Sequence, residues 1–476
     1  MMKALFVVSE CAPLVKTGGL ADVAGALPRA LAAHDVAVRV LLPGYRTVMG
    51  QIDNSKTLAR YADLFGGPAR LLSCQLAGLD LLIVDAPHLY DRDGAIYGDA
   101  TGADWSDNPE RFAALCKVGA MIAADGVDGW TPDIVHGHDW QAGFTPEYMR
   151  ALEVDTPFLF TIHNIAFHGN TDAGKLGVLG LDPARFTSEN FEFWGQISAL
   201  KAGIVGAAKI NTVSQTYAEE LLTPEFGIGM DGVLAARRAD LSGIVNGIDL
   251  DVWNPETDPD ITPYKSGSGK SANKKALRKT FGLGPSNGPL CVLVSRLTQQ
   301  KGIDLLLDAL PALLARDGQV AVLGSGDPTL EIALLAAADR LENLSVKIGY
   351  DEALSHQMMA GGDVILVPSR FEPCGLTQLY GLRYGTLPLV ALTGGLADTV
   401  INASPAALAR GVATGLQFFP VTAQALSNAF ARVCDLYDDS KTWKTMQRNA
   451  MKQPVGWETS AAAYKDIYKQ LTEGST

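Results

Sequence analysis

Short apolar segments alternate along the chain with longer segments in which apolar residues recur at helical spacing. The short segments end in glycine, proline or polar residues, and helical patterns follow them. That order is typical of βα units around parallel sheets. The candidate strands of the first half are 4–8, 36–42, 81–85, 133–136, 158–163 and 209–213. Those of the second half are 290–295, 319–323, 345–348, 363–367 and 387–391. The pattern therefore predicts an α/β fold with two parallel sheets.

The segment 254–273 separates the two series of strands and is rich in Pro, Asp, Ser, Gly and Lys. Because such a composition buries little apolar surface, we expect an exposed segment at a domain boundary. Residues 457–471 have apolar positions at helical spacing, which predicts a closing helix. The periodicity does not indicate on which domain this helix packs.

Composition narrows the class of protein. The chain has 476 residues, 47% hydrophobic and 19% charged, as in an ordinary globular protein. Its net charge of −13 comes from acidic residues spread along the chain, which argues against nucleic acid or an anionic membrane as a partner. The six cysteines show no CxxC spacing, which fits neither a disulfide framework nor a zinc site.

The start of the chain runs almost directly from Met1 into an apolar strand, without the features of an export leader. No uninterrupted apolar run reaches the ~18 residues that a membrane-spanning helix needs. We therefore expect a cytoplasmic protein.

A loop that could clamp phosphate follows the first strand. Two glycines, Gly18 and Gly19, stand at a predicted helix start, where backbone N–H groups and the helix dipole attract anions, and Lys16 adds a full charge. The same hexapeptide, TGGLAD, occurs at 17–22 and again at 393–398. We interpret the repeat as a shared phosphate-binding function. Coincidence, with a solvated lysine in a plain loop, is the alternative.

Two further polar segments follow strands of the second half. Arg296 and Lys301 come directly after one strand, and Glu372 follows another. Because ligands of parallel sheets lie at the carboxyl ends of the strands, the two cations can neutralise a diphosphate without a metal. Glu372 can hold sugar hydroxyls, and the helix start beyond Gly375 can receive phosphate. The alternatives are a solvated cation pair and a glutamate on an exposed turn.

A polar cluster is predicted after two strands of the first half. His136, His138 and Asp139 are conceivable metal ligands, but no HExxH motif or cysteine pair completes a set. We favour a sugar pocket instead, in which Asp139 and the downstream Asn164 bind hydroxyls and the neighbouring tryptophan covers a pyranose face. The segment GSGD at 324–327 lacks the third glycine of a dinucleotide site, and no GxSxG motif indicates a serine hydrolase.

Taken in order, these motifs resemble the family of bacterial glycogen synthases and plant starch synthases over nearly the whole chain. The matching segments are 16–23, 136–143 (HGHDWQAG), 161–169 (TIHNIAFHG), 245–249 (VNGID), 295–302, 370–378 and 393–400. The resemblance implies the GT-B architecture, with two doubly wound Rossmann-like domains facing across a cleft. It predicts an acceptor-side domain over 1–250, a nucleotide-sugar-binding domain over 251–455, and a closing helix within 456–476 that returns to the first domain.

The resemblance also implies roles for individual residues. The expected ligands of the diphosphate are Lys16, Arg296 and Lys301, with Gly18, Gly19, Gly394 and Gly395 supplying backbone donors. Glu372 and the following Cys374, Gly375, Leu376 and Thr377 are expected to bind the nucleotide sugar, and Tyr350 to stack on adenine. Asp139, His163 and Asn164 are expected near the reacting carbon, and Glu10, Tyr97 and Trp140 on the acceptor side. Of these, Asp139, His163, Arg296, Lys301 and Glu372 are the expected catalytic residues.

The reaction implied by the resemblance is transfer of glucose from ADP-glucose to α-1,4-glucan with retention at the anomeric carbon, without a metal or cofactor. Two positions depart from the pattern. Tyr380 stands where many related transferases carry a second glutamate, and Leu392 stands where an arginine is expected. The alternatives are a UDP-glucose-dependent or sucrose-forming transferase, a glucan phosphorylase and a non-catalytic glucan-binding protein.

Overall fold

The computed structural model describes residues 1–99 and 101–473. It divides the chain into two compact units. The first contains Met1–Asn246 and the segment that begins at Trp457, and the second contains Gly247–Gly456. The boundaries expected from the sequence, after residues 250 and 455, lie within a few residues of these. Residues 474–476, at the end of the predicted segment 456–476, lie outside the described residues.

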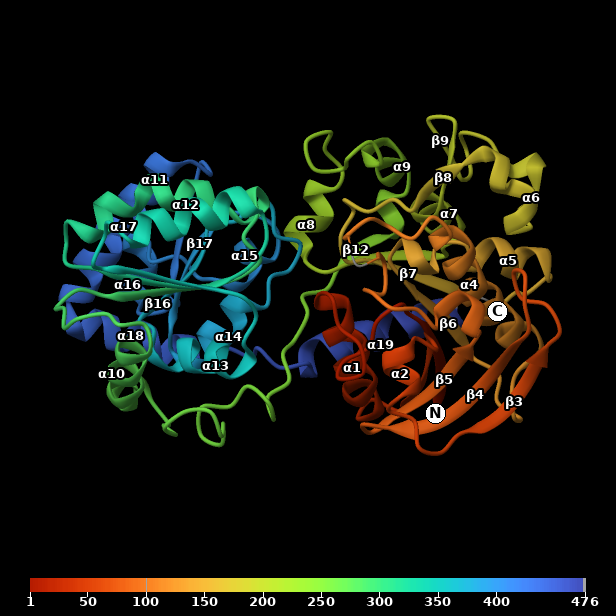
Figure 1. Cartoon of the computed structure of the whole chain (residues 1–476), viewed down its shortest axis with the longest axis horizontal. Coiled ribbons are helices and arrows are strands. Elements are labelled where there is room, and N and C mark those ends of the chain that lie inside the picture. Colours follow the sequence, from red (N-terminus) through yellow and green to blue (C-terminus); the bar gives the residue numbers. More distant parts are fainter. Residues whose placement is uncertain (100, 474–476) are drawn as a thin grey trace. The chain divides into compact units, whose positions relative to one another are not determined.

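The first unit is built on a nine-stranded sheet with the order β12-β11-β7-β6-β1-β2-β5-β4-β3 (Figure 1). The strands are β1 (Met2–Val7), β2 (Val36–Pro43), β3 (Lys56–Tyr61), β4 (Ala69–Leu76), β5 (Leu79–Asp85), β6 (Ile134–His138), β7 (Phe158–Ile162), β11 (Lys209–Thr212) and β12 (Leu241–Gly243). All neighbours are parallel except β4, which is antiparallel to β3 and β5. The carboxyl ends of β1, β6 and β7 therefore meet at one edge of the sheet.

The six strands predicted for the first half are all present in this sheet, whereas β3, β4 and β12 were not predicted. Strand β3 is an edge strand in which no residue is fully buried. A strand of this kind needs no run of apolar residues, so hydrophobic patterning does not reveal it.

Helices cover the sheet of the first unit. They are α1 (Gly19–Ala32), α2 (Arg46–Met49), α3 (Pro87–Tyr90), α4 (Asn108–Asp125), α5 (Thr145–Ala151), α6 (Leu176–Leu179), α7 (Ala199–Gly206), α8 (Gln215–Glu220), α9 (Asp231–Ala236) and α19 (Glu458–Glu473). The predicted closing helix is α19, and its fully buried Tyr464 and Tyr468 pack in this unit. Tyr468 Oη lies 2.8 Å from Nδ1 of His136 on β6, and Tyr464 Oη donates to Asn211 on β11 at 2.9 Å.

A small antiparallel sheet is inserted between β7 and α7. Its order is β8-β10-β9, with β8 at Asn170–Asp172, β9 at Glu192–Phe193 and β10 at Gln196–Ser198. The labels β8 and β9 mark it at the periphery of the unit in Figure 1.

The second unit is built on a six-stranded, wholly parallel sheet with the order β15-β14-β13-β16-β17-β18. Its strands are β13 (Leu290–Val294), β14 (Gln319–Gly324), β15 (Leu344–Ile348), β16 (Val364–Val367), β17 (Leu387–Ala391) and β18 (Leu416–Phe418). Its helices are α10 (Ser271–Thr280), α11 (Ile303–Leu314), α12 (Pro328–Ala338), α13 (Glu352–Gly361), α14 (Thr377–Tyr384), α15 (Gly394–Thr399), α16 (Pro405–Arg410), α17 (Ala423–Asp438) and α18 (Ser440–Met451). The five predicted strands are present, and only the short β18 was not predicted.

One prediction about this unit is right only in part. Most residues of the segment 254–273 are exposed, as expected, but the segment lies inside the second unit and not at its boundary, and it buries Tyr264 and Lys270 to 5% exposure each. The Lys270 ammonium donates to the carbonyl oxygens of Met359 and Tyr384 and to Oγ1 of Thr386, at 2.7 to 3.0 Å. These backbone acceptors compensate the buried charge, and composition alone does not reveal them. Burial nevertheless lowers the pKa of Lys270 to about 7.

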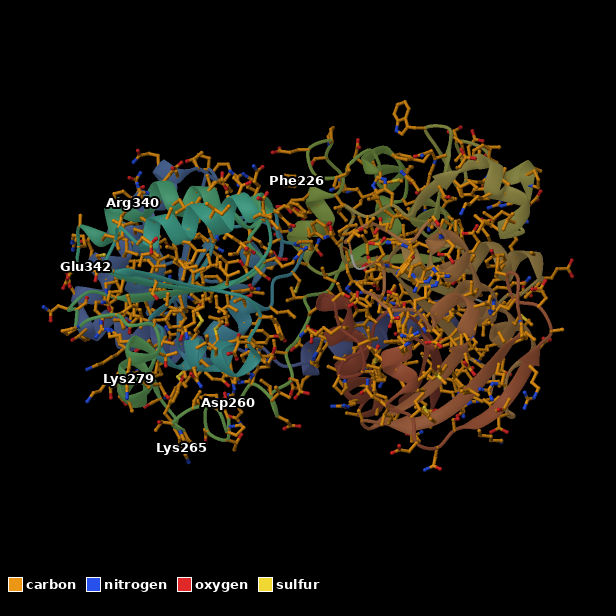
Figure 2. All side chains as sticks on the ribbon, in the orientation of Figure 1. Phe226, Asp260, Lys265, Lys279, Arg340 and Glu342 are labelled. Atoms are coloured by element: carbon orange, nitrogen blue, oxygen red, sulfur yellow. The ribbon has the colours of Figure 1, made fainter. Side chains whose placement is uncertain are left out.

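Charged side chains such as Lys265, Lys279, Arg340 and Glu342 point outward from the second unit, as Figure 2 shows. None of the helices in residues 1–99 and 101–473 combines the length and the apolar character that a membrane crossing requires.

Candidate functional site

In the first unit, Glu10 binds the loop 16–19 that follows β1, which contains Gly18 and Gly19 and is called the glycine loop. Its Oε2 accepts hydrogen bonds from the backbone N–H groups of Thr17 at 2.5 Å and Gly18 at 3.1 Å, and its Oε1 accepts one from Tyr97 Oη at 2.6 Å. Ser9 Oγ lies 2.7 Å from the same tyrosine oxygen. Glu10 and Tyr97 were predicted on the acceptor side. The structure brings them together and shows that they also order the loop.

The glycine loop leads into α1 without a side-chain cap at Gly18. A Cβ atom at Gly18 would meet nothing within 4 Å, so the backbone there is open to approach. Lys16 is 41% exposed, and its Nζ pairs with Asp22 in the first turn of α1 at 2.8 Å. The Gly18 N–H, which was predicted to face phosphate, donates to Glu10 in this structure, whereas Gly19 begins the helix.

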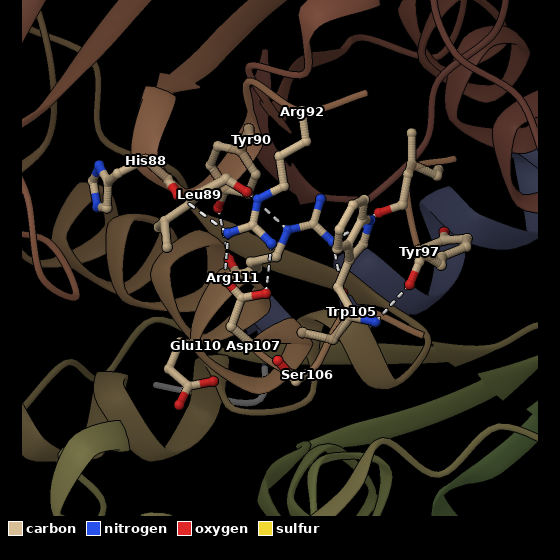
Figure 3. Close-up of polar contacts among 12 residues, drawn as sticks. His88, Leu89, Tyr90, Arg92, Tyr97, Trp105, Ser106, Asp107, Glu110 and Arg111 are labelled. Carbon is tan, nitrogen blue, oxygen red and sulfur yellow. Dashed lines mark hydrogen bonds and ion pairs between the residues drawn. The ribbon is translucent and has the colours of Figure 1, made fainter. Parts of the chain in front are cut away.

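A buried arginine holds the segment that carries Tyr97 (Figure 3). Arg111 is 1% exposed and donates to the carbonyl oxygens of Leu89 at 2.9 Å and Ile96 at 2.8 Å, and to Asn108 Oδ1 at 2.6 Å. The Asn108 amide in turn donates to the carbonyl oxygen of Tyr97 at 2.8 Å. Desolvation lowers the pKa of Arg111. Sequence reasoning missed this residue because a single arginine within a helical pattern carries no motif.

Asp139 lies at the carboxyl end of β6 with φ of 55°, a conformation that non-glycine residues rarely adopt. Its Oδ1 accepts the backbone N–H groups of His163 at 2.7 Å and Asn164 at 3.3 Å, which follow β7. Among the described residues no group binds Oδ2. Burial raises the pKa of Asp139 to about 7 although both hydrogen bonds lower it. Three predicted sugar-site residues therefore meet here.

The three histidines near Asp139 form a buried column and do not converge on one point as metal ligands would. His138 Nδ1 lies 3.0 Å from His163 Nε2, and His136 Nε2 lies 2.7 Å from Thr161 Oγ1. Desolvation lowers the pKa of His163 to about 3 and holds the pKa values of His136 and His138 well below the usual range, so all three rings are neutral at physiological pH. His138 Nε2 is buried without a partner among the described residues.

Trp140 follows Asp139 and packs edge-on against Phe112, with ring centroids 5.0 Å apart. A Cβ atom at Gly169 would come within 2.2 Å of the indole, so the chain after Asn164 passes directly over the ring. This contact joins the loop that ends at Gly169 to the candidate sugar residues.

In the second unit, Lys301 and Glu372 form an ion pair. Lys301 Nζ lies 2.5 Å from Glu372 Oε2, which also accepts Ser369 Oγ at 2.9 Å. The two side chains are only 17% and 10% exposed. The segments that carry them follow β13 and β16, which are neighbours in the sheet. Ser369 was not predicted as a site residue; it directly precedes the matching segment 370–378.

Arg296 precedes Lys301 in the loop after β13. Its side chain is exposed, and among the described residues the guanidinium has no hydrogen-bond or ion-pair partner. In the part of the chain that the structure describes, no hydrogen bond or ion pair joins it to Glu372. The structure therefore leaves this cation available to a ligand. Arg370 holds the same loop by donating to the carbonyl oxygen of Gln299 at 2.5 Å, and it also donates to both carboxylate oxygens of Asp304 in α11 at 2.6 and 2.8 Å.

The segment after Glu372 leads into α14. Cys374 is buried, Gly375 has φ of 70°, and Leu376 precedes the first helical residue, Thr377, without a side-chain cap. Gln378 donates to the carbonyl oxygens of Cys374 and Gly375 at 3.0 and 2.8 Å and so holds this turn in place. The start of α14 thus presents backbone N–H groups beside Glu372.

The second glycine loop packs against this turn. A Cβ atom at Gly394 would come within 2.1 Å of the Glu372 carbonyl oxygen, and one at Gly395 within 2.2 Å of the Cys374 carbonyl oxygen. The Gly395 N–H donates to the carbonyl oxygens of Glu372 and Pro373, both at 3.1 Å. These glycines were predicted to offer donors to phosphate. In this structure they allow the backbone of Gly394 and Gly395 to pack directly on the backbone of residues 372–374. The repeated hexapeptide therefore differs in local structure, since Gly18 faces open space.

Tyr350 is 81% exposed in the turn after β15, and its hydroxyl donates to the Glu352 carboxylate. A ring this exposed can stack on a planar group.

One group of potential metal ligands is made of residues other than these. Among the described residues, atoms of Asp258, Asp260 and His356 lie within 4.8 Å of one another. Asp258 Oδ2 accepts from His356 Nδ1 at 2.7 Å and from Tyr384 Oη, and its Oδ1 accepts the Asp260 N–H at 2.9 Å. Asp258 therefore already has protein donors on both oxygens. This contrasts with Oδ2 of Asp139, for which the described residues supply no donor.

Comparison with known proteins agrees with this arrangement. The family model "Starch synthase catalytic domain" matches residues 3–236, and the model "Glycosyl transferases group 1" matches residues 278–453. Two α/β units of this kind, with cations and a carboxylate after neighbouring parallel strands, define a glycosyltransferase of the GT-B fold class.

The chain is 69% identical to the glycogen synthase of Jannaschia sp. (strain CCS1), over 98% of this chain and 99% of the relative. It is 60% identical to the glycogen synthase of Paracoccus denitrificans (strain Pd 1222), over 99% and 100% of the two chains. The catalytic domain of starch synthase IV from Arabidopsis thaliana, bound to ADP and acarbose, is 30% identical with a TM-score of 0.87 and 99% coverage of both chains. The chain belongs to the glycogen synthase and starch synthase family.

Proposed function

We propose that this protein elongates α-1,4-glucan by transferring glucose from ADP-glucose to the 4-hydroxyl of a chain end, with retention at the anomeric carbon. Membership of the glycogen synthase family supports the reaction. The starch synthase relative is described as bound to ADP, which supports an adenine nucleotide as the donor. The observation that carries the proposal is the Lys301–Glu372 pair beside the start of α14.

We assign the donor diphosphate to Arg296, Lys301 and the first N–H groups of α14. Negative charge develops on the departing ADP as the bond to glucose breaks, and fixed cations in place beforehand stabilise it without reorganisation. Among residues 1–99 and 101–473, Arg296 has no hydrogen-bond or ion-pair partner that would compete. In the first unit, exposed Lys16 and the open backbone at Gly18 are further candidates for phosphate contact.

We assign the transferred glucose to Glu372. Both protein partners of its carboxylate bind Oε2, which leaves Oε1 for a sugar hydroxyl. The ion pair with Lys301 holds the side chain in one orientation, so little entropy is lost on binding. Tyr350 is assigned to the adenine ring because its exposed ring can stack.

We assign the acceptor side to Asp139, Asn164 and Trp140. Asp139 is held through Oδ1, and its Oδ2 is available to a sugar. In the ionised form this carboxylate stabilises positive charge that builds up on the glucose ring. A phosphate oxygen of the departing ADP takes the proton of the incoming 4-hydroxyl, while the bond from the anomeric carbon to phosphate breaks and that to the acceptor oxygen forms on the same face.

In this proposal the cations take the place of a divalent metal, so the reaction needs no metal ion. The test is transfer of labelled glucose to glycogen from ADP-glucose and from UDP-glucose, each with and without a chelator. We expect ADP-glucose to be the better donor by kcat/KM and the chelator to have no effect. Preference for UDP-glucose would favour the alternative donor. Loss of activity on chelation would refute metal independence, and a product with β-linkages would refute retention.

A further inference from the structure

We propose that Trp194, at the tip of the β9–β10 hairpin, is an anchoring contact for the α-glucan acceptor, separate from the residues assigned to the transfer step. The inference rests on the proposed function, because that function supplies a polymeric glucan as substrate. The Trp194 side chain is 86% exposed. Its recorded ring contact is with its neighbour Phe193, edge-on at 6.3 Å between centroids.

The hairpin turn would fold better with another residue. Phe193 pairs with Gln196, so Trp194 and Gly195 form a two-residue loop, and their φ values are 52° and 80°. Two-residue turns with positive φ at both positions favour Asn-Gly, because a bulky side chain is strained there. The indole gains no burial in return. A residue that breaks a local folding rule without a packing gain points to function.

Hydrogen bonds hold the β9–β10 hairpin that carries Trp194. The Gly195 N–H donates to Glu192 Oε1 at 2.6 Å and closes the turn. At the base, Lys201 is 5% exposed and donates to the carbonyl oxygens of Ser188 and Glu192, both at 2.6 Å. Strand β10 also pairs with β8. A ring held this way is presented without the loss of loop entropy on binding.

The chemistry around the ring fits a carbohydrate. The apolar faces of glucose pack on aromatic rings, and the hydroxyls at the rim need amides or carboxylates. Gln196 is exposed next to the turn and lies opposite Phe193 on β9 and Asp172 on β8, so these three side chains share one face of the small sheet. Asp172 is exposed as well.

The hairpin is continuous with the candidate acceptor residues. The Phe193 ring packs against His168 with centroids 5.1 Å apart. The carbonyl oxygens of His168 and Gly169 accept the N–H groups of Leu200 and Ala199, which follow β10. Gly169 in turn lies against Trp140, as described above. One unbroken set of contacts in the first unit therefore joins Trp194 to the acceptor side, and a long glucan can engage both.

A second glucan contact of this kind raises the effective concentration of a polymer at the transfer site. It does not change the binding of an acceptor that is too short to reach both contacts. The test compares Trp194→Asn, Trp194→Phe and the control Val178→Ala, which removes an exposed apolar side chain elsewhere in the unit. Asparagine suits the turn, so Trp194→Asn should keep or raise the melting temperature. Migration in glycogen-containing native gels without donor measures binding independently of transfer, so it remains informative if the proposed reaction is not observed.

We expect Trp194→Asn to weaken glycogen binding roughly fivefold and to raise KM for glycogen by the same factor, the effect of one aromatic contact at an interface. KM for maltotriose and for ADP-glucose should not change, and Trp194→Phe should retain most of the affinity. Unchanged glycogen binding would overturn the proposal. An equal rise in KM for maltotriose would place Trp194 in the transfer site and also overturn it. A fall in the oligomeric mass would assign the surface to a second copy of the chain instead.

Discussion

Lys301 Nζ lies 2.5 Å from Glu372 Oε2, and this pair connects the segments that follow β13 and β16. Replacing Lys301 by alanine removes a cation assigned to the leaving phosphate and leaves Glu372 without its counter-charge. We expect kcat/KM for ADP-glucose to fall about 100-fold, as for loss of one fixed group that stabilises developing charge. Steady-state kinetics measure this. Lys279→Ala, at an exposed lysine of the same unit, is the control, and an equal loss in both variants would contradict the assignment.

Asp139 makes stability depend on pH in a defined direction. Its pKa is about 7 in the folded protein and 3.8 in the reference state, so between these values the folded state holds a proton that the unfolded state has lost. The free energy of unfolding of the wild type should therefore fall, relative to Asp139→Asn, as pH rises from about 4 to about 7. We expect a relative change on the order of 2 kcal/mol, since partial exposure reduces the full linkage value.

Urea unfolding of both proteins at pH 5 and pH 8 checks this prediction. Asparagine keeps an oxygen that accepts the N–H groups of His163 and Asn164, so the comparison isolates the charge. His163 is neutral in the folded state at both pH values because its pKa is about 3, and its titration in the unfolded chain is common to both proteins and cancels in the comparison. A difference between the two proteins that is the same at pH 5 and pH 8 would show that the carboxyl titrates normally.

Arg111 should be necessary for the stability of the first unit. Arg111→Met leaves the buried carbonyl oxygens of Leu89 and Ile96 without their donor. We expect a loss of about 3 kcal/mol in the free energy of unfolding, because the unpaired acceptors remain buried. Arg60→Met replaces an exposed arginine of the same unit and should cost less than about 0.5 kcal/mol. Equal values from chemical denaturation would contradict the network in Figure 3.

Gly395 should be required for nucleotide binding although it is not expected to touch the nucleotide. A Cβ atom there would lie 2.2 Å from the Cys374 carbonyl oxygen, so Gly395→Ala pushes the turn between Glu372 and α14 out of place. We expect destabilisation by about 2 kcal/mol, as for an overpacked site, and at least tenfold weaker ADP binding by calorimetry. Gly284→Ala has open space around it and serves as the control. Unchanged ADP affinity in Gly395→Ala would contradict this role.

Much of the fold follows from the sequence because buried parallel strands are apolar throughout and end at polar loops. All eleven predicted strands are present for this reason, whereas β3 lies at a sheet edge and has no such pattern. The observed strand order explains why Lys301 and Glu372, distant in sequence, meet in the structure, because β13 and β16 are neighbours in the sheet. The segment 254–273 is mostly exposed, as its composition predicts, but composition does not reveal that backbone carbonyl oxygens compensate the buried Lys270.

Details of the candidate site could not be predicted. The hydrogen bonds of Glu10 to the glycine loop and the packing of Gly395 on Cys374 depend on where two backbones approach each other. The two copies of the hexapeptide TGGLAD have different neighbours in the structure. This also depends on which backbone segment approaches each copy. Trp194 was not predicted as a functional residue either, since only its exposure and its positive φ in the structure make it unusual.

The claim on which the account depends is that cations and helix N–H groups of the second unit bind the diphosphate of the donor. A crystal structure of the protein with ADP tests this most directly. We predict that the β-phosphate oxygens lie within ion-pair distance of Arg296 and Lys301 and next to the start of α14. A nucleotide bound elsewhere, or held through a metal ion with both side chains turned away, would contradict the account.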